Sequence, residues 1–342
     1  MLKKSNTEIG MGMIDEQIRT KFESAHLIGI TAHIRPDGDA IGSVLGLGMS
    51  LIQAGKNVQM VLKDGVSHSF RHLEGSEMIK SNFTEECDLY VAVDCSDIKR
   101  VGGVLDGKQV GIAIDHHITN DSYASVNLIV PEAVATCEIL AEHLPLWNLP
   151  VTLAVARALL TGIISDSIGF RTSNTTAKSL RLAADLMDVG ANISELYNKA
   201  LIYRSYSATN YWGYALARLQ HEDNLVWTSL TLQDRTNSGY SGNDDADLTN
   251  ILSSIDPLDV AVLFVEQKAD LTKVSWRARP GLDISPLATS FGGGGHPAAS
   301  GAEIKGTLDE VQNLVLTATR KYLDQIKVEE TNGKHIMGGK DL

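Results

Sequence analysis

The sequence predicts an α/β protein with a mostly parallel N-terminal sheet, helices on both faces of that sheet, and a smaller α/β domain after it. Three observations predict this. Short apolar runs alternate with helical patterns in the first half, which is typical of a parallel sheet. The length of 342 residues exceeds that of a usual single domain. The alternation restarts after about residue 221, where a second domain is therefore expected.

The N-terminal half provides the strands of the predicted parallel sheet. Residues 26–32 form an apolar run that indicates a buried strand, and the pattern after it indicates a helix near residues 40–53. Further strands are expected at residues 57–62, 88–93 and 110–114, and further helices at residues 134–143, 151–164 and 176–187. Ligands bind at the carboxyl ends of the strands in such sheets, so polar residues there are candidates for a functional site.

A helical stretch rich in aromatic residues separates the two predicted domains. We expect a first domain over residues 13–203, a helical linker over residues 204–221 and a second domain over residues 222–327. Within the second domain, strands are expected at residues 224–232, 260–266 and 272–278, with helices near residues 247–255 and at residues 308–326. The polar ends, residues 1–12 and 328–342, are predicted to be disordered.

Charge and composition limit the class of partner. The chain has 42 acidic and 30 basic residues and a net charge of −12, whereas proteins that hold long polynucleotides use many basic contacts to phosphate. A short oligonucleotide or a small nucleotide fits better than a long duplex. The chain has no apolar run of about 18 residues and no secretory signal pattern, so neither a membrane nor export is expected. Three scattered cysteines are consistent with a reducing cytoplasm.

Acidic and histidine side chains follow several of the predicted strands. The loop after the first strand reads HIRPDGD, the strand at residues 88–93 is followed by an aspartate, and the strand at residues 110–114 is followed by DHH. A further aspartate follows the helix at residues 151–164. The resulting set is His33, Asp37, Asp39, Asp94, Asp115, His116, His117 and Asp166.

These side chains together indicate a metal site, although each alone has a simpler explanation. A single aspartate at the end of a strand is commonly a helix N-cap or a turn former, and histidine pairs often bind nothing. Several carboxylates at the same edge of a sheet would repel one another unless cations bound there. Oxygen and imidazole ligands without thiolate suit manganese, magnesium or iron better than a structural zinc site.

The motifs that carry these residues are similar to those of a known family. HIRPDGDAIGS, AVDCSD, IDHH and GIISDSIGF resemble the four motifs of the DHH phosphoesterases, in order, spacing and context. The later segment FGGGGH, followed by AASG, resembles the signature of the associated DHHA1 substrate-binding domain. The stand-alone layout resembles the NrnA group, which degrades very short oligoribonucleotides and dephosphorylates 3′-phosphoadenosine 5′-phosphate (pAp). Proteins that open or finish degrading cyclic dinucleotides share that layout.

The resemblance implies two bound divalent cations, with Mn²⁺ first and Mg²⁺ or another ion as alternatives. One cation would be held by His33, Asp37 and Asp94, and the other by Asp39, Asp94, His116 and Asp166, so that Asp94 bridges. Two cations roughly 3.5–4 Å apart can share a water, lower its pKa and clamp phosphate oxygens. Asp115 would orient His116, and His117 would donate a hydrogen bond or a proton to the phosphate or the leaving group.

Substrate-binding residues are expected in the second domain. Four consecutive glycines leave a bare backbone whose N–H groups can approach a phosphate, so Gly293, Gly294 and Gly295 are candidates, with His296 as a side-chain donor. Arg277 resembles the phosphate-binding arginine of the family, and a guanidinium suits phosphate. The simpler readings are a flexible glycine loop and an exposed strand arginine. By resemblance, the site would lie in a cleft between the domains and would select short substrates.

The leading functional interpretation is a metal-dependent phosphoesterase that hydrolyses very short oligoribonucleotides to mononucleotides and pAp to AMP. A second interpretation is a phosphodiesterase acting on cyclic-di-AMP or on linear pApA or pGpG, because the motifs do not separate these substrates. A third, of a different class, is an inert nucleotide-binding sensor, against which the intact acid and histidine set argues. The resemblance alone suggests a homodimer through the first domain.

Overall fold

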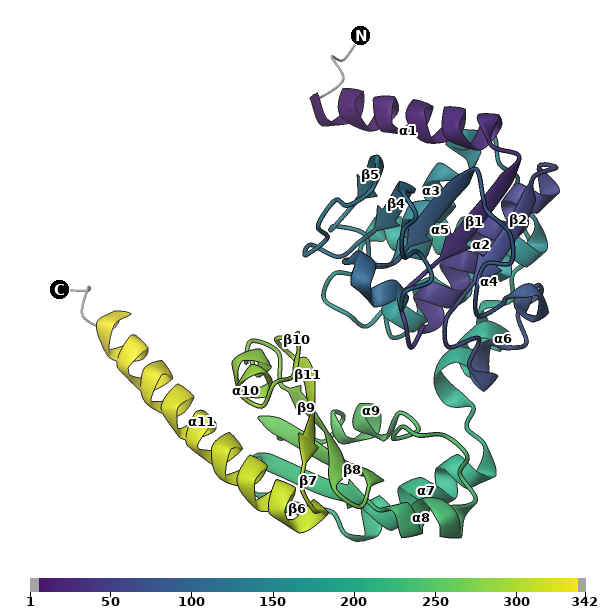
Figure 1. The fold of residues 1–342 in the computed structure, drawn as a ribbon. Coiled ribbons are helices and arrows are strands. Elements are labelled where there is room, and N and C mark those ends of the chain that lie inside the picture. Colours follow the sequence, from purple (N-terminus) through teal and green to yellow (C-terminus); the bar gives the residue numbers. More distant parts are fainter. Residues whose placement is uncertain (1–5, 338–342) are drawn as a thin grey trace. The chain divides into compact units, whose positions relative to one another are not determined.

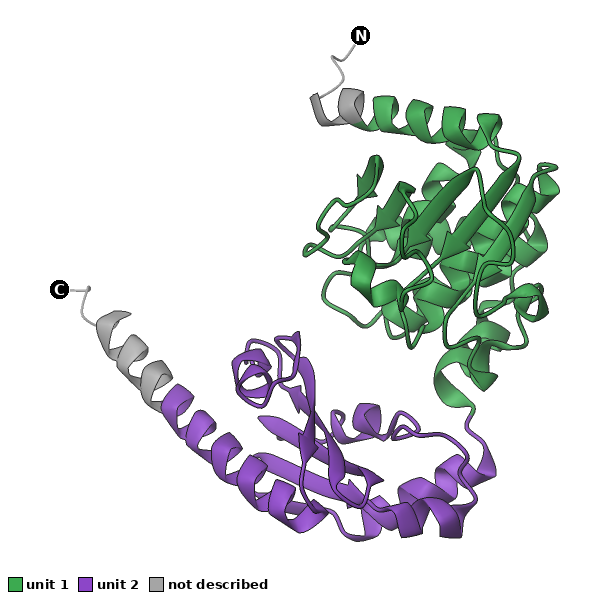
Figure 2. Cartoon of the chain, viewed as in Figure 1, with its two compact units in different colours: residues 1–203 green, residues 204–342 purple. Residues whose placement is uncertain are grey.

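The chain folds into two compact units, each with its own sheet. The computed structural model describes the main chain of residues 6–337 and the side chains of residues 11–327. The units are Met1–Tyr203 and Arg204–Leu342 (Figure 2). Both are α/β, the first with a parallel sheet and the second with a mixed one, so the predicted fold class is confirmed. Over the described residues, no helix has both the length and the apolar character that a bilayer crossing requires.

The sheet of the first unit is parallel throughout. Its strand order is β2-β1-β3-β4-β5, with bounds β1 Leu27–Thr31, β2 Asn57–Val61, β3 Leu89–Val93, β4 Val110–Asp115 and β5 Val126–Ile129 (Figure 1). The chain runs outward from β1 to β2 and then returns to β3 on the other side of β1. The connections after β1 and β3 therefore diverge, and this switch point at the carboxyl ends of the strands is where ligands bind in open α/β sheets.

The two faces of this sheet are covered differently. Alternate strand residues point to opposite faces, so Val91 and Val93 of β3 lie in the main core while Tyr90 and Ala92 lie in a smaller cluster. Six α-helices are described in this unit, and all contribute to the main core: α1 Asn6–Ser24, α2 Gly38–Gln53, α3 Thr136–His143, α4 Leu153–Asp166, α5 Ala177–Asp188 and α6 Ile193–Tyr197. The helical cover expected on the second face is limited to the 3₁₀ helix η3 (Ile98–Val101) and adjoining turns.

Helices α2 and α4 pack closely along a stripe of glycines. Gly38, Gly42 and Gly46 recur every four residues and so lie on one face of α2. A Cβ atom at Gly42 would lie 2.6 Å from the carbonyl oxygen of Ala158 on α4, and the same atom at Gly38 would collide with Ser165. This close approach holds the first turn of α2 beside the last turn of α4, and both turns carry predicted metal ligands.

Helices extend into both segments that were expected to be disordered. Helix α1 begins at Asn6 and α11 (Leu308–Met337) ends at Met337, whereas residues 1–5 and 338–342 lie outside the described residues. Two observations account for α1. Its residues Ile18 and Phe22 are buried in the main core, and Asp15 accepts hydrogen bonds from His143 Nδ1 at 2.7 Å and Trp147 Nε1 at 2.9 Å.

The second unit has a mixed sheet between two helical layers. The strand order is β10-β11-β9-β8-β7-β6, with bounds β6 Gln220–Glu222, β7 Leu225–Leu230, β8 Val260–Lys268, β9 Leu271–Ala278, β10 Gly294–His296 and β11 Ala299–Lys305. Helices α10 (Ser285–Ser290) and α11 pack around Trp276, and helices α7 (Tyr206–Ala217) and α9 (Leu248–Leu252) pack around Tyr211 on the other face (Figure 1). Helix α8 (Leu232–Ser238) lies beside α7.

The predicted linker helix is part of the core of the second unit. Tyr211 and Ala215 of α7 are both 0% exposed and pack against Leu230 of β7 and Leu248 of α9. The remaining short elements are all in the first unit, namely η1 His68–Phe70, η2 Ser76–Met78, η4 Pro145–Trp147 and the single π-helical turn η5 Asn198–Ile202.

Candidate metal centre

Six acidic and histidine side chains converge at the switch point of the first sheet. Their ligand atoms form two groups, His33, Asp37 and Asp94, and Asp39, His116 and Asp166, and within each group these atoms lie within 4.8 Å of one another. A third group that meets the same criterion, Asp94, His116 and His117, overlaps both and includes His117. Each predicted metal ligand is therefore close to others, although the chain places them after β1, after β3, after β4 and at the end of α4.

The first group is built around His33, which is 5% exposed. Its Nε2 atom lies 3.5 Å from Asp94 Oδ2 and 3.8 Å from Asp37 Oδ2. Its Nδ1 atom lies 2.8 Å from the carbonyl oxygen of Ile34. An N–H at Nδ1 would donate to that carbonyl and leave the Nε2 lone pair available for a cation.

Asp37 serves as a helix N-cap and as a member of the cluster at the same time. Its Oδ1 atom accepts hydrogen bonds from the main-chain N–H groups of Asp39 and Ala40, at 3.0 and 3.1 Å, and so caps α2. The other carboxylate oxygen faces His33. The two readings of this aspartate, as N-cap and as ligand, are therefore compatible.

His116 is the centre of the second group. Its Nε2 atom lies 3.5 Å from Asp166 Oδ2, 3.7 Å from Asp94 Oδ1 and 4.0 Å from Asp39 Oδ2. Its Nδ1 atom lies 3.3 Å from the carbonyl oxygen of Ala133. Asp94 thus presents one oxygen to each group, which is the arrangement expected of a carboxylate shared by two cations.

The backbone of Asp94 adopts an unusual conformation that directs its side chain into the site. Its φ angle is 50°, in the left-handed region, which costs a residue other than glycine roughly 1–2 kcal/mol. The Oγ1 atom of Thr136 donates a hydrogen bond of 3.1 Å to Asp94 Oδ1. Thr136 was not among the predicted residues. It stands at the start of a predicted helix, but no motif links it to Asp94.

The N-terminus of α3 holds the carboxylate of Asp39. The main-chain N–H groups of Thr136 and Cys137 donate to its two oxygens at 2.6 and 2.9 Å. Helix N-termini stabilise negative charge, because their N–H groups are free and the helix dipole is positive there. This support comes from backbone atoms about a hundred residues away, and the sequence gives no sign of it.

Without a cation, the cluster must hold protons. Burial raises the pKa of Asp39 well above its usual range, and the charges of Asp94 and Asp166 add to this. Burial also raises the pKa of Asp166 to about 7. Burial lowers the pKa of His33 and His116, but the neighbouring aspartates outweigh it and raise both to about 9. Divalent cations would replace these protons, so the donor set fits them.

The two cysteines near the cluster remain thiols. Burial raises the pKa of Cys95 to about 12 and that of Cys137 well above its ordinary value. The Cys95 thiol donates to the carbonyl oxygen of Asp97 at 3.1 Å. Soft thiolate donors are thus missing from the described cluster, and its oxygen and imidazole donors suit Mn²⁺ or Mg²⁺.

Asp115 orients His117, and the expectation that it orients the ring of His116 is wrong. Asp115 Oδ1 lies 2.7 Å from His117 Nδ1 and also accepts the main-chain N–H of His116 at 2.8 Å. The His116 ring is held instead by the carbonyl oxygen of Ala133. His117 lies beside the cluster, with Nδ1 3.7 Å from Asp94 Oδ1. The sequence places three adjacent residues in one motif, but only side-chain geometry shows which ring the aspartate meets.

In the second unit, the sheet brings Arg277 and His296 into one row. Across the strands, His296 is paired with Ala299, and Ala299 with Arg277. Directly opposed residues point to the same face, so both side chains are on one face, two strand spacings apart, or about 10 Å. Arg277 donates from Nη2 to Thr249 Oγ1 at 3.4 Å.

The glycine segment is more ordered than the predicted loop. Gly292 and Gly293 donate their N–H groups to the carbonyl oxygens of Thr289 and Ala288, at 2.9 and 3.0 Å. A Cβ atom at Gly293 would also collide with Gly301. The N–H of Gly293 is therefore not available to a phosphate. The residue must be glycine because the close packing leaves no room for a side chain. Gly294 and Gly295 belong to β10, which is an edge strand of the sheet.

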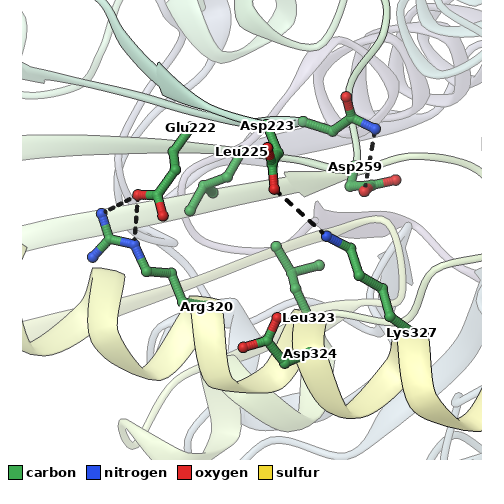
Figure 3. A pocket seen from close by; sticks show the side chains of 9 residues that line it. Glu222, Asp223, Leu225, Asp259, Arg320, Leu323, Asp324 and Lys327 are labelled. Atoms are coloured by element: carbon green, nitrogen blue, oxygen red, sulfur yellow. Dashed lines mark hydrogen bonds and ion pairs between the residues drawn. The ribbon is translucent and has the colours of Figure 1, made fainter.

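A surface hollow in the second unit is separate from all of these residues. It lies between α11 and the strands β6 and β7 (Figure 3). Arg320 pairs with Glu222 at 2.8 Å and Lys327 with Asp223 at 4.0 Å, so the charges that line it largely pair with one another. None of the predicted site residues lines it.

Comparisons with known proteins agree with the two units. Residues 27–163 match the model of the DHH family, N-terminal domain, and residues 230–323 match the DHHA1 domain. The bifunctional oligoribonuclease and PAP phosphatase NrnA of Thermus thermophilus is 32% identical over 299 residues, which cover 86% of this chain and 90% of that protein.

Two solved structures have a similar fold. An exopolyphosphatase-related protein from Bacteroides fragilis is 25% identical, with a TM-score of 0.86 over 92% of this chain and 98% of that one. RecJ from Thermus thermophilus, in complex with Mn²⁺, is 15% identical with a TM-score of 0.52, over 92% of this chain and 55% of its own. At that identity, RecJ shows the similarity of the fold alone.

Proposed function

This chain belongs to the DHH family of phosphoesterases, and from that premise we propose that it hydrolyses very short oligoribonucleotides to mononucleotides and pAp to AMP. The proposed cofactors are two divalent cations, with Mn²⁺ as the preferred ion. Support for the substrate class comes from the relative of 32% identity, whose name gives both activities. The net charge of −12 agrees with small rather than long nucleic-acid substrates.

The observation that carries the proposal is the convergence of six ligand side chains at the switch point, with Asp94 shared between the two groups. We assign His33, Asp37 and Asp94 to one cation, and Asp39, Asp94, His116 and Asp166 to the other. Cations bound there would supply a water of lowered pKa and would compensate negative charge on the phosphoryl oxygens.

The residues around the cluster would perform the remaining steps. His117 would donate a hydrogen bond or a proton to the phosphate or to the leaving oxygen, through Nε2, because its Nδ1 is bonded to Asp115. Thr136 and the N-terminus of α3 would keep the carboxylates of Asp94 and Asp39 in place. These contacts fix the site before substrate arrives, which favours catalysis by positioning.

The row of Arg277 and His296 is our candidate for binding the far phosphate of the substrate. A guanidinium can donate two parallel hydrogen bonds to phosphate, and an imidazole adds a third donor. Of the glycines, Gly294 and Gly295 stay in this proposal. A Cβ atom at Gly294 would have no atom within 4 Å, so its backbone is open to a ligand.

A substrate panel tests the proposal. Purified protein with Mn²⁺ would be given pAp, pApA, pGpG, cyclic-di-AMP and a long single-stranded RNA, and products would be separated by chromatography. We expect fast release of AMP from pAp and of mononucleotides from the linear dinucleotides. Preference for cyclic-di-AMP would support the phosphodiesterase alternative. Nucleotide binding without turnover in Mn²⁺ would overturn the proposed enzymatic activity and support the interpretation as an inert nucleotide-binding sensor.

A further inference from the structure

We infer that Asn120 is a positioning residue of the metal site. Its side-chain amide holds Asp115, and through Asp115 the ring of His117, in a fixed position relative to the backbone that follows Asp94. The inference rests on the proposed function, since it assigns a purpose to the geometry of His117. Asn120 lies in the turn after the DHH triplet and is partly buried.

Asn120 uses all of its side-chain hydrogen-bonding groups on fixed partners. Its Nδ2 atom donates to Asp115 Oδ2 at 2.7 Å and to the carbonyl oxygen of Cys95 at 3.1 Å. Its Oδ1 atom accepts the main-chain N–H of Ser122 at 2.8 Å. Carboxylate and carbonyl oxygens only accept, and a main-chain N–H only donates, so these partners require an amide in this orientation.

The contact with Asp115 fixes the carboxylate that orients His117. Oδ1 of Asp115 is bonded to His117 Nδ1, and Oδ2 is bonded to Asn120, so the two contacts leave the carboxylate no freedom to rotate. Without the amide, Oδ2 would lose its partner, and the Asp115 side chain could turn away from the imidazole. Partners of this kind orient the groups that act on the substrate.

The contact with Cys95 fixes the strained chain next to the shared aspartate. Asp94 has a φ of 50°, and the carbonyl oxygen of the next residue, Cys95, accepts hydrogen bonds from Asn120 and from Tyr123 Oη at 2.8 Å. The main-chain N–H of Asp121 adds a bond to the carbonyl oxygen of Ser96 at 3.1 Å. A strained conformation persists only where its surroundings hold it, and Asn120 is part of that support.

The inference is tested with Asn120→Ala and Asn120→Asp. The aspartate keeps the volume of the side chain but replaces both donors with a carboxylate that faces Asp115. For both variants we expect kcat to fall about 10- to 100-fold, the usual loss when such a partner is removed, with KM for pAp changed much less. Asn127→Ala is the matched control: the side chain of Asn127 bonds to the main-chain N–H and carbonyl oxygen of Ala124, at 3.1 and 2.7 Å, and this variant should keep wild-type kcat.

Two further readouts separate positioning from general damage. In a double-mutant cycle, Asn120→Ala should cost clearly less once His117 is alanine, because the part of its effect that passes through Asp115 and His117 is then already lost. In ¹⁵N-histidine NMR of the Mg²⁺-loaded protein, Asn120→Ala should shift the Nδ1–H signal of His117, whereas Asn127→Ala should not. Wild-type kcat in both Asn120 variants, full additivity in the cycle, or an unchanged His117 signal would each overturn the inference. If His117→Ala itself kept wild-type activity, the proposed role of His117 would fail instead.

Discussion

Nε2 of His33 lies 3.5 Å from Oδ2 of Asp94, across the switch point between β1 and β3. The other oxygen of the same carboxylate faces His116. Replacing Asp94 by alanine should therefore remove both cations and lower turnover of pAp by roughly a thousandfold or more, equivalent to about 4 kcal/mol of transition-state stabilisation. Elemental analysis of the Mn²⁺-loaded protein and initial rates check this.

Asp97→Asn is the control for that substitution. Asp97 stands three residues further on, where it caps η3 through Lys99 N at 2.9 Å, and it is not in the cluster. The metal content of the Asp97→Asn protein should equal that of the wild type. An Asp94→Ala protein that retained stoichiometric manganese and wild-type turnover would contradict the shared-ligand assignment.

Two adjacent histidines should separate metal binding from catalysis. His116 is surrounded by three carboxylates of the cluster, so His116→Ala should lower the manganese content. His117 is bonded to Asp115, and His117→Ala should leave manganese close to the wild-type level while lowering kcat about 10²- to 10⁴-fold, the range for loss of a general acid. Metal content and kcat are measured on the same preparations. Equal metal loss in both variants would show that His117 is a ligand.

Stability of the metal-free protein should fall as the pH rises. The pKa values of His33 and His116 are raised to about 9 and that of Asp166 to about 7. A group whose pKa is raised by folding stabilises the fold below its unfolded pKa, and this contribution is lost as the pH passes through the folded pKa. The stabilising contribution is thus lost between about pH 4 and 7 for Asp166 and between about pH 6.5 and 9 for the two histidines.

Thermal melts in EDTA between pH 5.5 and 9 check this expectation. Added Mn²⁺ should remove most of the pH dependence, because the cation takes the place of the protons, and its binding should release protons in calorimetry at pH 7.5. A Tm in EDTA that rose with pH over this range would mean that the carboxylates are balanced by other cationic groups.

The sequence predicts the ligand set because most of the side chains that could bind metal follow the predicted strands closely. The apolar runs of β3 and β4 are each followed directly by polar site residues, and the carboxyl ends of parallel strands meet at one edge of the sheet. Strand β5 was missed because it has only four residues, and β10 because two of its three residues are glycines, which have no strand propensity.

The residues that support the ligands were not predictable in the same way. Thr136 and the carbonyl oxygen of Ala133 reach the site because the start of α3 lies beside it. Every residue has a main-chain carbonyl oxygen, so the sequence does not mark the one that holds the His116 ring. Asn120 has a turn-like context, TND, but one of its two acceptors lies at the end of β4 and the other just after β3. The direction of the Asp115 side chain depends on rotamers, and a motif does not specify them.

Close packing of α2 on α4 predicts a large cost for a small substitution. Gly42→Ala would bring a Cβ atom to 2.6 Å from the Ala158 carbonyl oxygen, so the helices must separate, at a cost of about 1–3 kcal/mol. Gly12→Ala in α1 is the matched control, because no atom lies within 4 Å of its Cβ position. This control should be neutral or up to about 1 kcal/mol stabilising. Urea unfolding measures both, and equal effects would exclude the packing explanation.

Arg277 should act on substrate binding and not on metal content. Hydrogen bonds to a charged partner contribute about 1.5–3 kcal/mol, so Arg277→Ala should raise KM for pAp by about 10- to 100-fold. Arg277→Lys keeps the charge but loses the planar fork, and it should recover only part of the affinity. Arg279→Ala is the control, since Arg279 pairs with Asp259 at 2.8 Å. Manganese content should be unchanged in all three variants, and a KM that stayed at the wild-type value in Arg277→Ala would exclude this arginine from the phosphate site.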